Sequence, residues 1–341
     1  MPIKINGLQG GAAQQSGQIE IITLLRGIAA TLVFLFHLVC VSGGYISGAT
    51  LHSVFFYGKY GVQFFFVISG FVIPYSMMKA GYQLRDFPRF FQKRIIRIEP
   101  PYLCVVFLTV CFLYFRSVFG FDRGSMELPT WPQILLHIGY LIPLSGYRWM
   151  SIVFWTLAIE FQFYLLFSLT FPLFVRGPWP RRGLYLVLII ASIVVPNGGF
   201  FFCWSPIFLM GIHTALFKMK KVNNLEYWVT IALLSAVVFH DLGWVTVIFA
   251  IIAVLAIYFE PQIRSRLLHF LGNVSYSLYL SHTLIAFAII NLGVRFTKNI
   301  YQKCFFVSLA VAATLLFSYL LYRFIEIPAK KWAAAIRYQH E

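Results

Sequence analysis

Ten long apolar runs dominate this sequence and limit the folds open to it. They fall at about 19–41, 61–78, 100–116, 152–175, 183–196, 201–217, 227–240, 243–259, 271–293 and 304–326. A transmembrane α-helix needs about 20 predominantly apolar residues, and lipid accepts only segments whose backbone hydrogen bonds are all satisfied. The sequence therefore predicts an all-α fold, a polytopic membrane helix bundle with about ten transmembrane helices.

The composition agrees with lipid as the main surroundings. Hydrophobic residues make up 60% of the 341 residues and charged residues only 11%, whereas a soluble domain carries about 25% charged residues. This excludes a soluble cytosolic enzyme, a disordered chain and a secreted disulfide scaffold. The five cysteines form no Cys-x-x-Cys pair, so we expect packing residues and no metal site.

We expect three segments along the chain. Residues 1–18 are rich in Gly, Gln, Ser and Ala and are predicted to be a flexible cytoplasmic tail. Residues 19–332 form the membrane domain, and 333–341 form a second cytoplasmic tail, with no fused extramembrane domain. A shorter run at 131–145 is interrupted by Pro132 and Pro143. It is typical of an interfacial or re-entrant segment; if it spanned the membrane, the orientation of everything after it would invert.

The charge balance predicts the orientation. The chain has 27 Lys and Arg against 11 Asp and Glu. With ten spans and both termini in the cytoplasm, 19 basic residues fall in cytoplasmic loops and 7 outside, with Arg26 inside the first span. This satisfies the positive-inside rule. We therefore predict a multi-pass protein of the inner or plasma membrane that contacts membrane lipids, with no nucleic acid partner.

Ionisable side chains inside predicted spans are candidates for function because their burial in lipid is costly. Arg26 and His37 are eleven residues apart in the first span. That spacing puts both on one helix face, about 16 Å apart along the axis. The alternatives are an arginine that reaches the interface and a histidine bonded to a neighbouring carbonyl.

Two further polar stripes lie on predicted spans: Thr156-Glu160-Tyr164 at positions i, i+4 and i+8, and Ser275-Tyr279-His282 at i, i+4 and i+7. Each trio shares one helix face. A buried carboxylate such as Glu160 needs a partner, so a structural ion pair and a catalytic role both remain open. The second stripe is either a hydrogen-bonded packing stripe or part of a site around His282.

A basic segment precedes the third span. Lys93, Arg94 and Arg97 stand within Arg85–Pro100 among apolar neighbours, a pattern typical of a helix lying along the cytoplasmic face. The cluster binds either anionic lipid or the phosphates of a ligand. We expect Pro100 and Pro101 to end this helix before the span begins.

Six motifs occur in order along the chain: Arg26-x10-His37, Gly61-Val-Gln-Phe-Phe-Phe-Val-Ile-Ser-Gly70-Phe, Lys93-Arg94-Ile-Ile-Arg97-Ile-x-Pro100, Trp155-Thr-Leu-x-x-Glu160-x-x-Phe-Tyr164, Leu271-Gly-x-x-Ser-Tyr-Ser-Leu-Tyr-Leu-x-His282 and Tyr322-Arg-Phe-Ile-Glu326-x-Pro328. The set closely resembles the acyltransferase-3 family of integral-membrane O-acyltransferases. The resemblance covers about residues 19 to 332. Glu99 departs from the pattern, because relatives usually have an uncharged residue there.

The resemblance implies ten membrane helices and an O-acetyltransferase activity. The donor would be acetyl-CoA or another acyl-CoA, and the acceptor a hydroxyl of a cell-surface or exported carbohydrate or glycolipid. By position, the resemblance implies that His37 and Arg26 are the essential pair and that Arg94 and Arg97, with Lys93 beside them, bind the donor. It also implies that Glu160 and His282 are catalytic residues. Ser275, Tyr279 and Glu326 are expected to support the site structurally.

The chemistry of the residues agrees with this reading. An alcohol attacks a thioester only when a base takes its proton, and an imidazole such as that of His37 suits this task near neutral pH. No metal is expected. The alternative is a multispan transporter or flippase of a glycan or lipid, which would also carry buried charges. Against it, the sequence shows no inverted repeat of the kind common in transporters.

Overall fold

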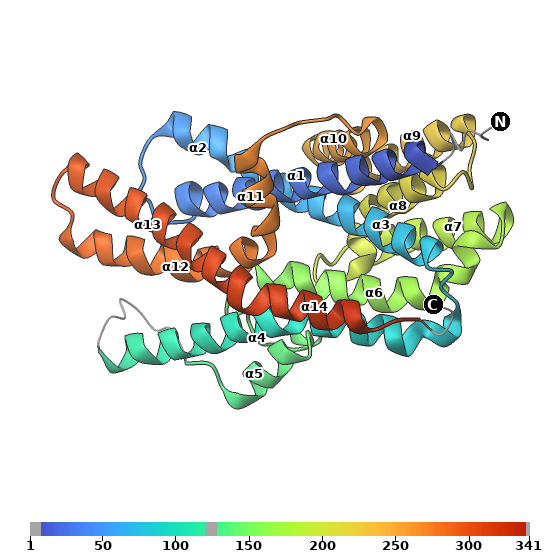
Figure 1. The fold of residues 1–341 in the computed structure, drawn as a ribbon. Coiled ribbons are helices and arrows are strands. Elements are labelled where there is room, and N and C mark those ends of the chain that lie inside the picture. Colours follow the sequence, from blue (N-terminus) through green and yellow to red (C-terminus); the bar gives the residue numbers. More distant parts are fainter. Residues whose placement is uncertain (1–7, 120–127, 339–341) are drawn as a thin grey trace, which may run out of the picture.

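The computed structural model describes residues 8–119 and 128–338, and these residues form helices without any β-strand (Figure 1). The predicted all-α bundle is confirmed. The helices are α1 (Leu8–Cys40), α2 (Ala49–Phe56), α3 (Gly61–Lys79), α4 (Phe87–Val118), α5 (Trp131–Ile138), α6 (Phe154–Val175), α7 (Pro178–Val194), α8 (Phe201–Lys218), α9 (Asn224–Leu242), α10 (Trp244–Phe259), α11 (Arg266–Asn273), α12 (Ser275–Phe296), α13 (Ile300–Leu321) and α14 (Ile327–Ala335).

Helices occupy all ten of the predicted spans. Within the described residues, eight segments are long and apolar enough to cross a membrane. The other two runs form the shorter helices α7 and α10, with 17 and 16 residues. The start of α1 and the end of α14 lie toward the same end of the bundle (Figure 1), as an even number of crossings requires.

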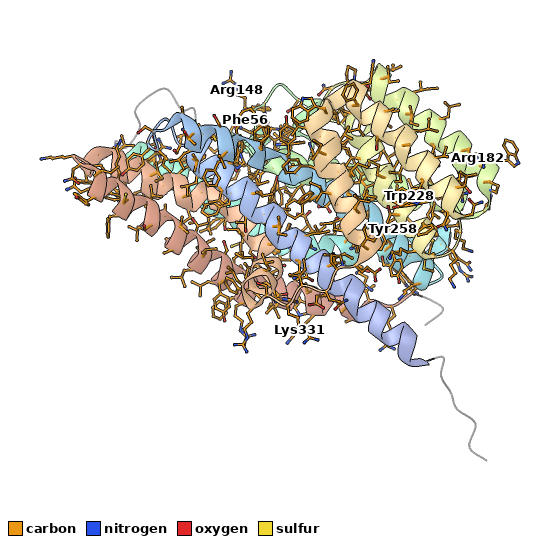
Figure 2. All side chains as sticks on the ribbon, turned by 90° about the horizontal axis from the view of Figure 1, so that it is seen from above. Phe56, Arg148, Arg182, Trp228, Tyr258 and Lys331 are labelled. Carbon is orange, nitrogen blue, oxygen red and sulfur yellow. The ribbon has the colours of Figure 1, made fainter. Side chains whose placement is uncertain are left out.

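The lipid-facing surface is apolar and the charges lie at the periphery. Large side chains such as Phe107, Leu233 and Leu316 are 60% or more exposed, which suits contact with lipid. Charged side chains, among them Arg182 and Lys331, project from the edge of the molecule (Figure 2). The surface therefore matches the prediction of a chain embedded in a bilayer.

Two predicted boundaries differ from the structure. α1 begins at Leu8, so residues 8–18 belong to a helix and not to a flexible tail, because Ala and Gln there favour helix. α14 likewise continues to Ala335, while residues 1–7 and 339–341 of the predicted tails lie outside the described residues. The run 131–145 holds only the eight-residue α5 and the short 3₁₀ turn Ile142–Leu144. At about 1.5 Å per residue, α5 is too short to span the bilayer.

The predicted break before the third span is wrong. α4 runs without interruption through Pro100 and Pro101. Membrane helices tolerate proline where neighbouring side chains satisfy the freed backbone groups. Pro100 and Pro101 free the carbonyl oxygens of Ile96 and Arg97, four residues earlier. Next to these, the Tyr276 hydroxyl from α12 donates to the carbonyl oxygen of Ile98 at 2.9 Å. The basic residues before the prolines are therefore carried on the membrane helix itself and not on a separate surface helix.

Small residues allow two close helix crossings that shape the centre of the bundle. A Cβ atom added to Gly211 of α8 would lie 2.2 Å from the carbonyl oxygen of Val67 of α3. A Cβ atom on Gly272 of α11 would lie 2.2 Å from the carbonyl oxygen of Thr23 of α1. Glycine at such crossings is what lets membrane helices approach this closely. The two crossings hold α3 against α8 and α1 against α11.

Candidate active site

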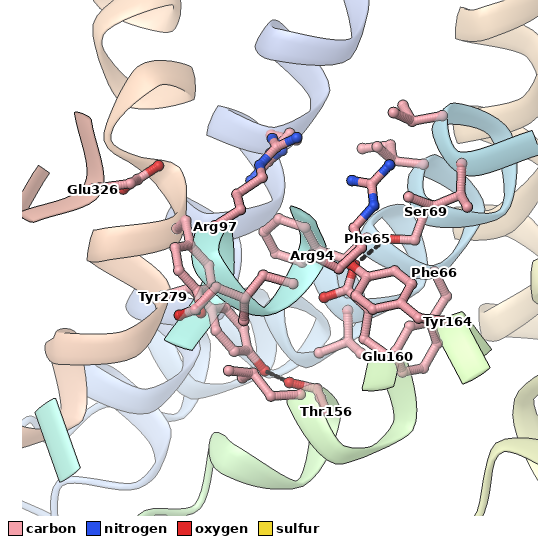
Figure 3. A pocket seen from close by; sticks show the side chains of 18 of the residues that line it. Phe65, Phe66, Ser69, Arg94, Arg97, Thr156, Glu160, Tyr164, Tyr279 and Glu326 are labelled. Atoms are coloured by element: carbon pink, nitrogen blue, oxygen red, sulfur yellow. Dashed lines mark hydrogen bonds between the residues drawn. The ribbon is translucent and has the colours of Figure 1, made fainter. Parts of the chain in front are cut away.

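A central cavity gathers charged side chains from helices that are far apart in sequence (Figure 3). Water-sized molecules find about 90 Å³ of space inside it, and all of its empty space, counted together with open solvent, is about 930 Å³. α1, α3, α4, α6, α12 and the C-terminal helices all contribute to its wall. Four basic side chains and two carboxylates line it: Arg26, Arg94, Arg97, Lys330, Glu160 and Glu326. The cavity thus carries an excess of positive charge within an otherwise apolar bundle.

The two arginines of α4 point into the cavity (Figure 3). The Arg94 guanidinium lies 5.3 Å from the ring centre of Phe90 and 5.7 Å from that of Tyr164, so aromatic rings support it. Its buried Nε atom has no hydrogen-bond partner among the described residues. Arginine forks of this kind suit phosphate groups, which accept charge-assisted hydrogen bonds.

The carboxylates are held by hydroxyl groups. Glu160 accepts a hydrogen bond from Ser69 of α3. Glu326 is 1% exposed and ends a π-helical turn, Tyr322–Glu326, between α13 and α14. Ser277 donates to its Oε2 at 2.6 Å, and Lys330 lies 2.6 Å from its Oε1. Both carboxylates therefore have partners, and the arginines of the cavity keep their positive charge available.

A tyrosine lines the end of the cavity opposite the arginine side chains, which we call its inner end (Figure 3). Tyr279 of α12 and Thr156 of α6 are joined through their hydroxyl groups at 2.7 Å. The ring of Phe65 packs edge-on against the ring of Tyr279, with 5.3 Å between the ring centres. In Figure 3 this hydrogen bond lies at the opposite end of the cavity from the guanidinium groups of Arg94 and Arg97.

Two histidines meet just behind this inner end. His37 Nδ1 of α1 lies 2.9 Å from His282 Nε2 of α12. His37 is 8% exposed and His282 is fully buried, and neither belongs to the cavity lining. The ring of Tyr279 contacts the ring of His282, with 6.0 Å between the ring centres. Tyr279 thus lines the cavity and also contacts one member of the imidazole pair.

The hydrogen-bond partners assign the protons of this pair. His282 Nδ1 lies 3.0 Å from the carbonyl oxygen of Leu278, which can only accept, so Nδ1 carries the proton. His282 Nε2 then accepts the hydrogen bond that His37 Nδ1 donates. The remaining nitrogen of His37, Nε2, keeps a lone pair and can take a proton from a substrate.

The remaining predicted residues lie around this centre. Lys93 does not line the cavity; its amino group lies 3.4 Å from the carbonyl oxygen of Ile336. Ser275 donates to the carbonyl oxygen of Gly272 at 2.7 Å and supports the turn between α11 and α12. Sequence reasoning missed Lys330 and Ser69. The available signals were the i, i+4 spacing of Glu326 and Lys330 and the serine within the motif of α3.

Comparison with known proteins gives the family of the chain. The family model of the acyltransferase-3 acyltransferase domain matches residues 19–323, so the chain belongs to the acyltransferase-3 family. In the wider fold comparison, no solved structure matches.

Two named relatives have the same level of identity. "O-acetyltransferase OatA" of Staphylococcus aureus (strain NCTC 8325 / PS 47) is 25% identical over 90% of this chain and 56% of its own length. "Acyltransferase MdmB" of Streptomyces mycarofaciens is 25% identical over 77% of this chain and 78% of its own length. The chain thus spans little more than half the length of the first relative and over three quarters of the second.

Proposed function

We propose that this protein is a membrane O-acyltransferase that moves an acyl group, in particular acetyl, from acyl-CoA to a hydroxyl. The acceptor we propose is a cell-surface or exported glycan or glycolipid. The observation that carries the proposal is the imidazole pair of His37 and His282, which lies next to a residue of the inner end of a positively charged cavity, Tyr279. Membership of the family supports it, as do the names of the relatives OatA and MdmB.

The cavity suits the donor. Coenzyme A carries a pyrophosphate and a 3′-phosphate, and these groups need arginine or lysine partners. Arg94, Arg97, Arg26 and Lys330 supply such partners. With the phosphates at the guanidinium end, the thioester would extend toward Tyr279 and Thr156, and so toward the imidazole pair.

The reaction then follows from the free nitrogen of His37. Nε2 takes the proton of the acceptor hydroxyl as its oxygen attacks the thioester carbonyl carbon. The new C–O bond forms, the C–S bond breaks, and the proton passes from His37 to the thiolate, which leaves as the thiol of coenzyme A. His282 holds the His37 ring through the 2.9 Å hydrogen bond and thereby orients Nε2.

The orientation in the membrane is part of the proposal. Acyl-CoA is a cytoplasmic compound, so we place both termini and the mouth of the cavity in the cytoplasm of a cell with this protein in its inner or plasma membrane. The distribution of Lys and Arg supports this placement. A reporter fused at the C-terminus should be active only on the cytoplasmic side, and activity on the outer side would refute the placement.

Two measurements on purified protein test the activity. Acetyl-CoA and coenzyme A should raise the thermal midpoint of the protein, because a ligand that binds only the folded state stabilises it. His37→Gln should still be stabilised by both compounds. Its rate of coenzyme A thiol release, measured with a cell-envelope glycan extract as acceptor, should be about 10²-fold or more below that of wild type. Near-normal turnover of His37→Gln would refute the role of His37. The absence of any stabilisation by coenzyme A would favour the transporter alternative.

A further inference from the structure

Tyr279 stands between the cavity and the imidazole pair. One edge of the side chain lines the cavity, where its hydroxyl meets Thr156. The ring contacts the ring of His282, at 6.0 Å between centres, and the ring of Phe65, at 5.3 Å. Tyr279 is 6% exposed. The same side chain therefore lines the cavity and packs against His282, the partner of His37.

The direction of the hydrogen bond shows how this ring is held. Thr156 Oγ1 donates to the carbonyl oxygen of Val153 at 3.0 Å, which uses its only proton. The Tyr279 hydroxyl is therefore the donor to Thr156 Oγ1 at 2.7 Å. That hydrogen bond and the ring contacts keep the side chain in place, and the tyrosine proton is not available to a substrate in this position.

The closed position is incompatible with acyl transfer. The attacking oxygen must come within about 3–3.5 Å of the acyl carbon while it lies within hydrogen-bond reach of the base. A thioester in the cavity meets the Tyr279 side chain, which lines it, whereas His37 and His282 lie outside the lining and His282 contacts the Tyr279 ring. The ring must move before the thioester and a hydroxyl held by His37 can meet.

We propose that Tyr279 is a positioning residue that keeps the donor thioester from the imidazole pair until its ring moves, and so protects the acyl group from water. This inference rests on the proposed function. The reaction it prevents is hydrolysis: a water oxygen forms the new C–O bond, the C–S bond breaks, and the products are the free carboxylic acid and the thiol of coenzyme A. Exclusion of water from reactive groups is a known role of closed active sites.

The test needs no acceptor. Purified protein is incubated with acetyl-CoA alone, and release of the coenzyme A thiol is followed in wild type, Tyr279→Ala, Tyr279→Phe and the double variant Tyr279→Ala with His37→Gln. Tyr279→Ala opens the passage and should raise hydrolysis about tenfold or more, since a positioned base then reaches water beside the thioester. Tyr279→Phe keeps the ring but loses the hydrogen bond and should show a smaller rise. The double variant should fall back to the wild-type rate.

Tyr82→Phe is the matched control. Tyr82 is also a buried tyrosine that donates one hydrogen bond, to the carbonyl oxygen of Ser168 at 3.1 Å, but it does not line the cavity. Loss of that hydrogen bond should leave acceptor-free hydrolysis at the wild-type level. An equal rise in Tyr82→Phe would mean that loss of any buried tyrosine hydroxyl admits water, and it would overturn the inference.

The outcomes separate this inference from the proposed function. Unchanged hydrolysis in both Tyr279 variants, with stabilisation by coenzyme A intact, would refute the role of Tyr279 alone. If coenzyme A does not stabilise the wild type, and if the wild type shows no turnover that depends on His37, the proposed function is refuted. If Tyr279→Ala fails to fold, as judged by its thermal midpoint, Tyr279→Phe decides, because it retains the packing of the ring.

Discussion

Replacement of His282 measures how much the imidazole pair contributes to turnover. In His282→Leu, the buried Nδ1–H of His37 loses the acceptor that lies 2.9 Å away. A buried donor without a partner costs about 1–3 kcal/mol. If this cost falls on the reactive arrangement of His37, kcat drops by roughly 5-fold to 150-fold, at 1.4 kcal/mol for each factor of ten. The KM for acetyl-CoA should not change, because His282 does not line the cavity.

The assay is thiol release from acetyl-CoA with a cell-envelope glycan extract, run on folded variants that acetyl-CoA still stabilises. His282→Gln is the matched control, since its side-chain carbonyl oxygen can accept the same hydrogen bond. It should recover most of the activity that His282→Leu loses. A His282→Leu variant within about twofold of wild type would refute the orienting role, because a missing partner costs more than that. A loss as large as that of His37→Gln, without recovery in His282→Gln, would instead make His282 the base.

Three further outcomes test the donor site and the fold. Arg94→Ala with Arg97→Ala should raise the KM for acetyl-CoA about tenfold or more at little change in kcat, because phosphate contacts act mostly as uniform binding, and salt should mimic the effect. Arg89→Ala, on the same helix but outside the cavity lining, is the control. An unchanged KM for acetyl-CoA in the double variant would mean that these arginines serve only the topology of the chain in the membrane. Gly211→Ala should lower the thermal midpoint strongly, since its Cβ would lie 2.2 Å from a backbone oxygen of α3; an unaltered midpoint would contradict this crossing. Burial lowers the pKa of His137 in α5, so its contribution to stability is present above about pH 6.5 and lost as the pH falls. His137→Gln should therefore lose less stability than wild type on acidification, and an equal loss would contradict the assignment.

The helices and their polar faces followed from the sequence because both depend on local patterns. Ten apolar runs predicted ten helices, and the i, i+4, i+8 stripe of Thr156, Glu160 and Tyr164 predicted a shared face. All three side chains indeed line one cavity. The spacing of apolar and polar residues along a single helix is enough for such statements, since the helix turns by a constant angle at each residue.

The contacts between helices could not be predicted from the sequence and required the tertiary structure. His37 and His282 are 245 residues apart in sequence and hydrogen-bonded in the fold, and no local spacing encodes that contact. The local rule for proline predicted a break in α4 that the structure does not have, because membrane helices tolerate proline where their surroundings satisfy the freed backbone groups. The sequence alone determined which residues face the interior of the bundle. The packing of α1, α6 and α12 against one another decided which of those residues come into contact. Such contacts depend on how two helix surfaces pack, which is not a property of one sequence segment.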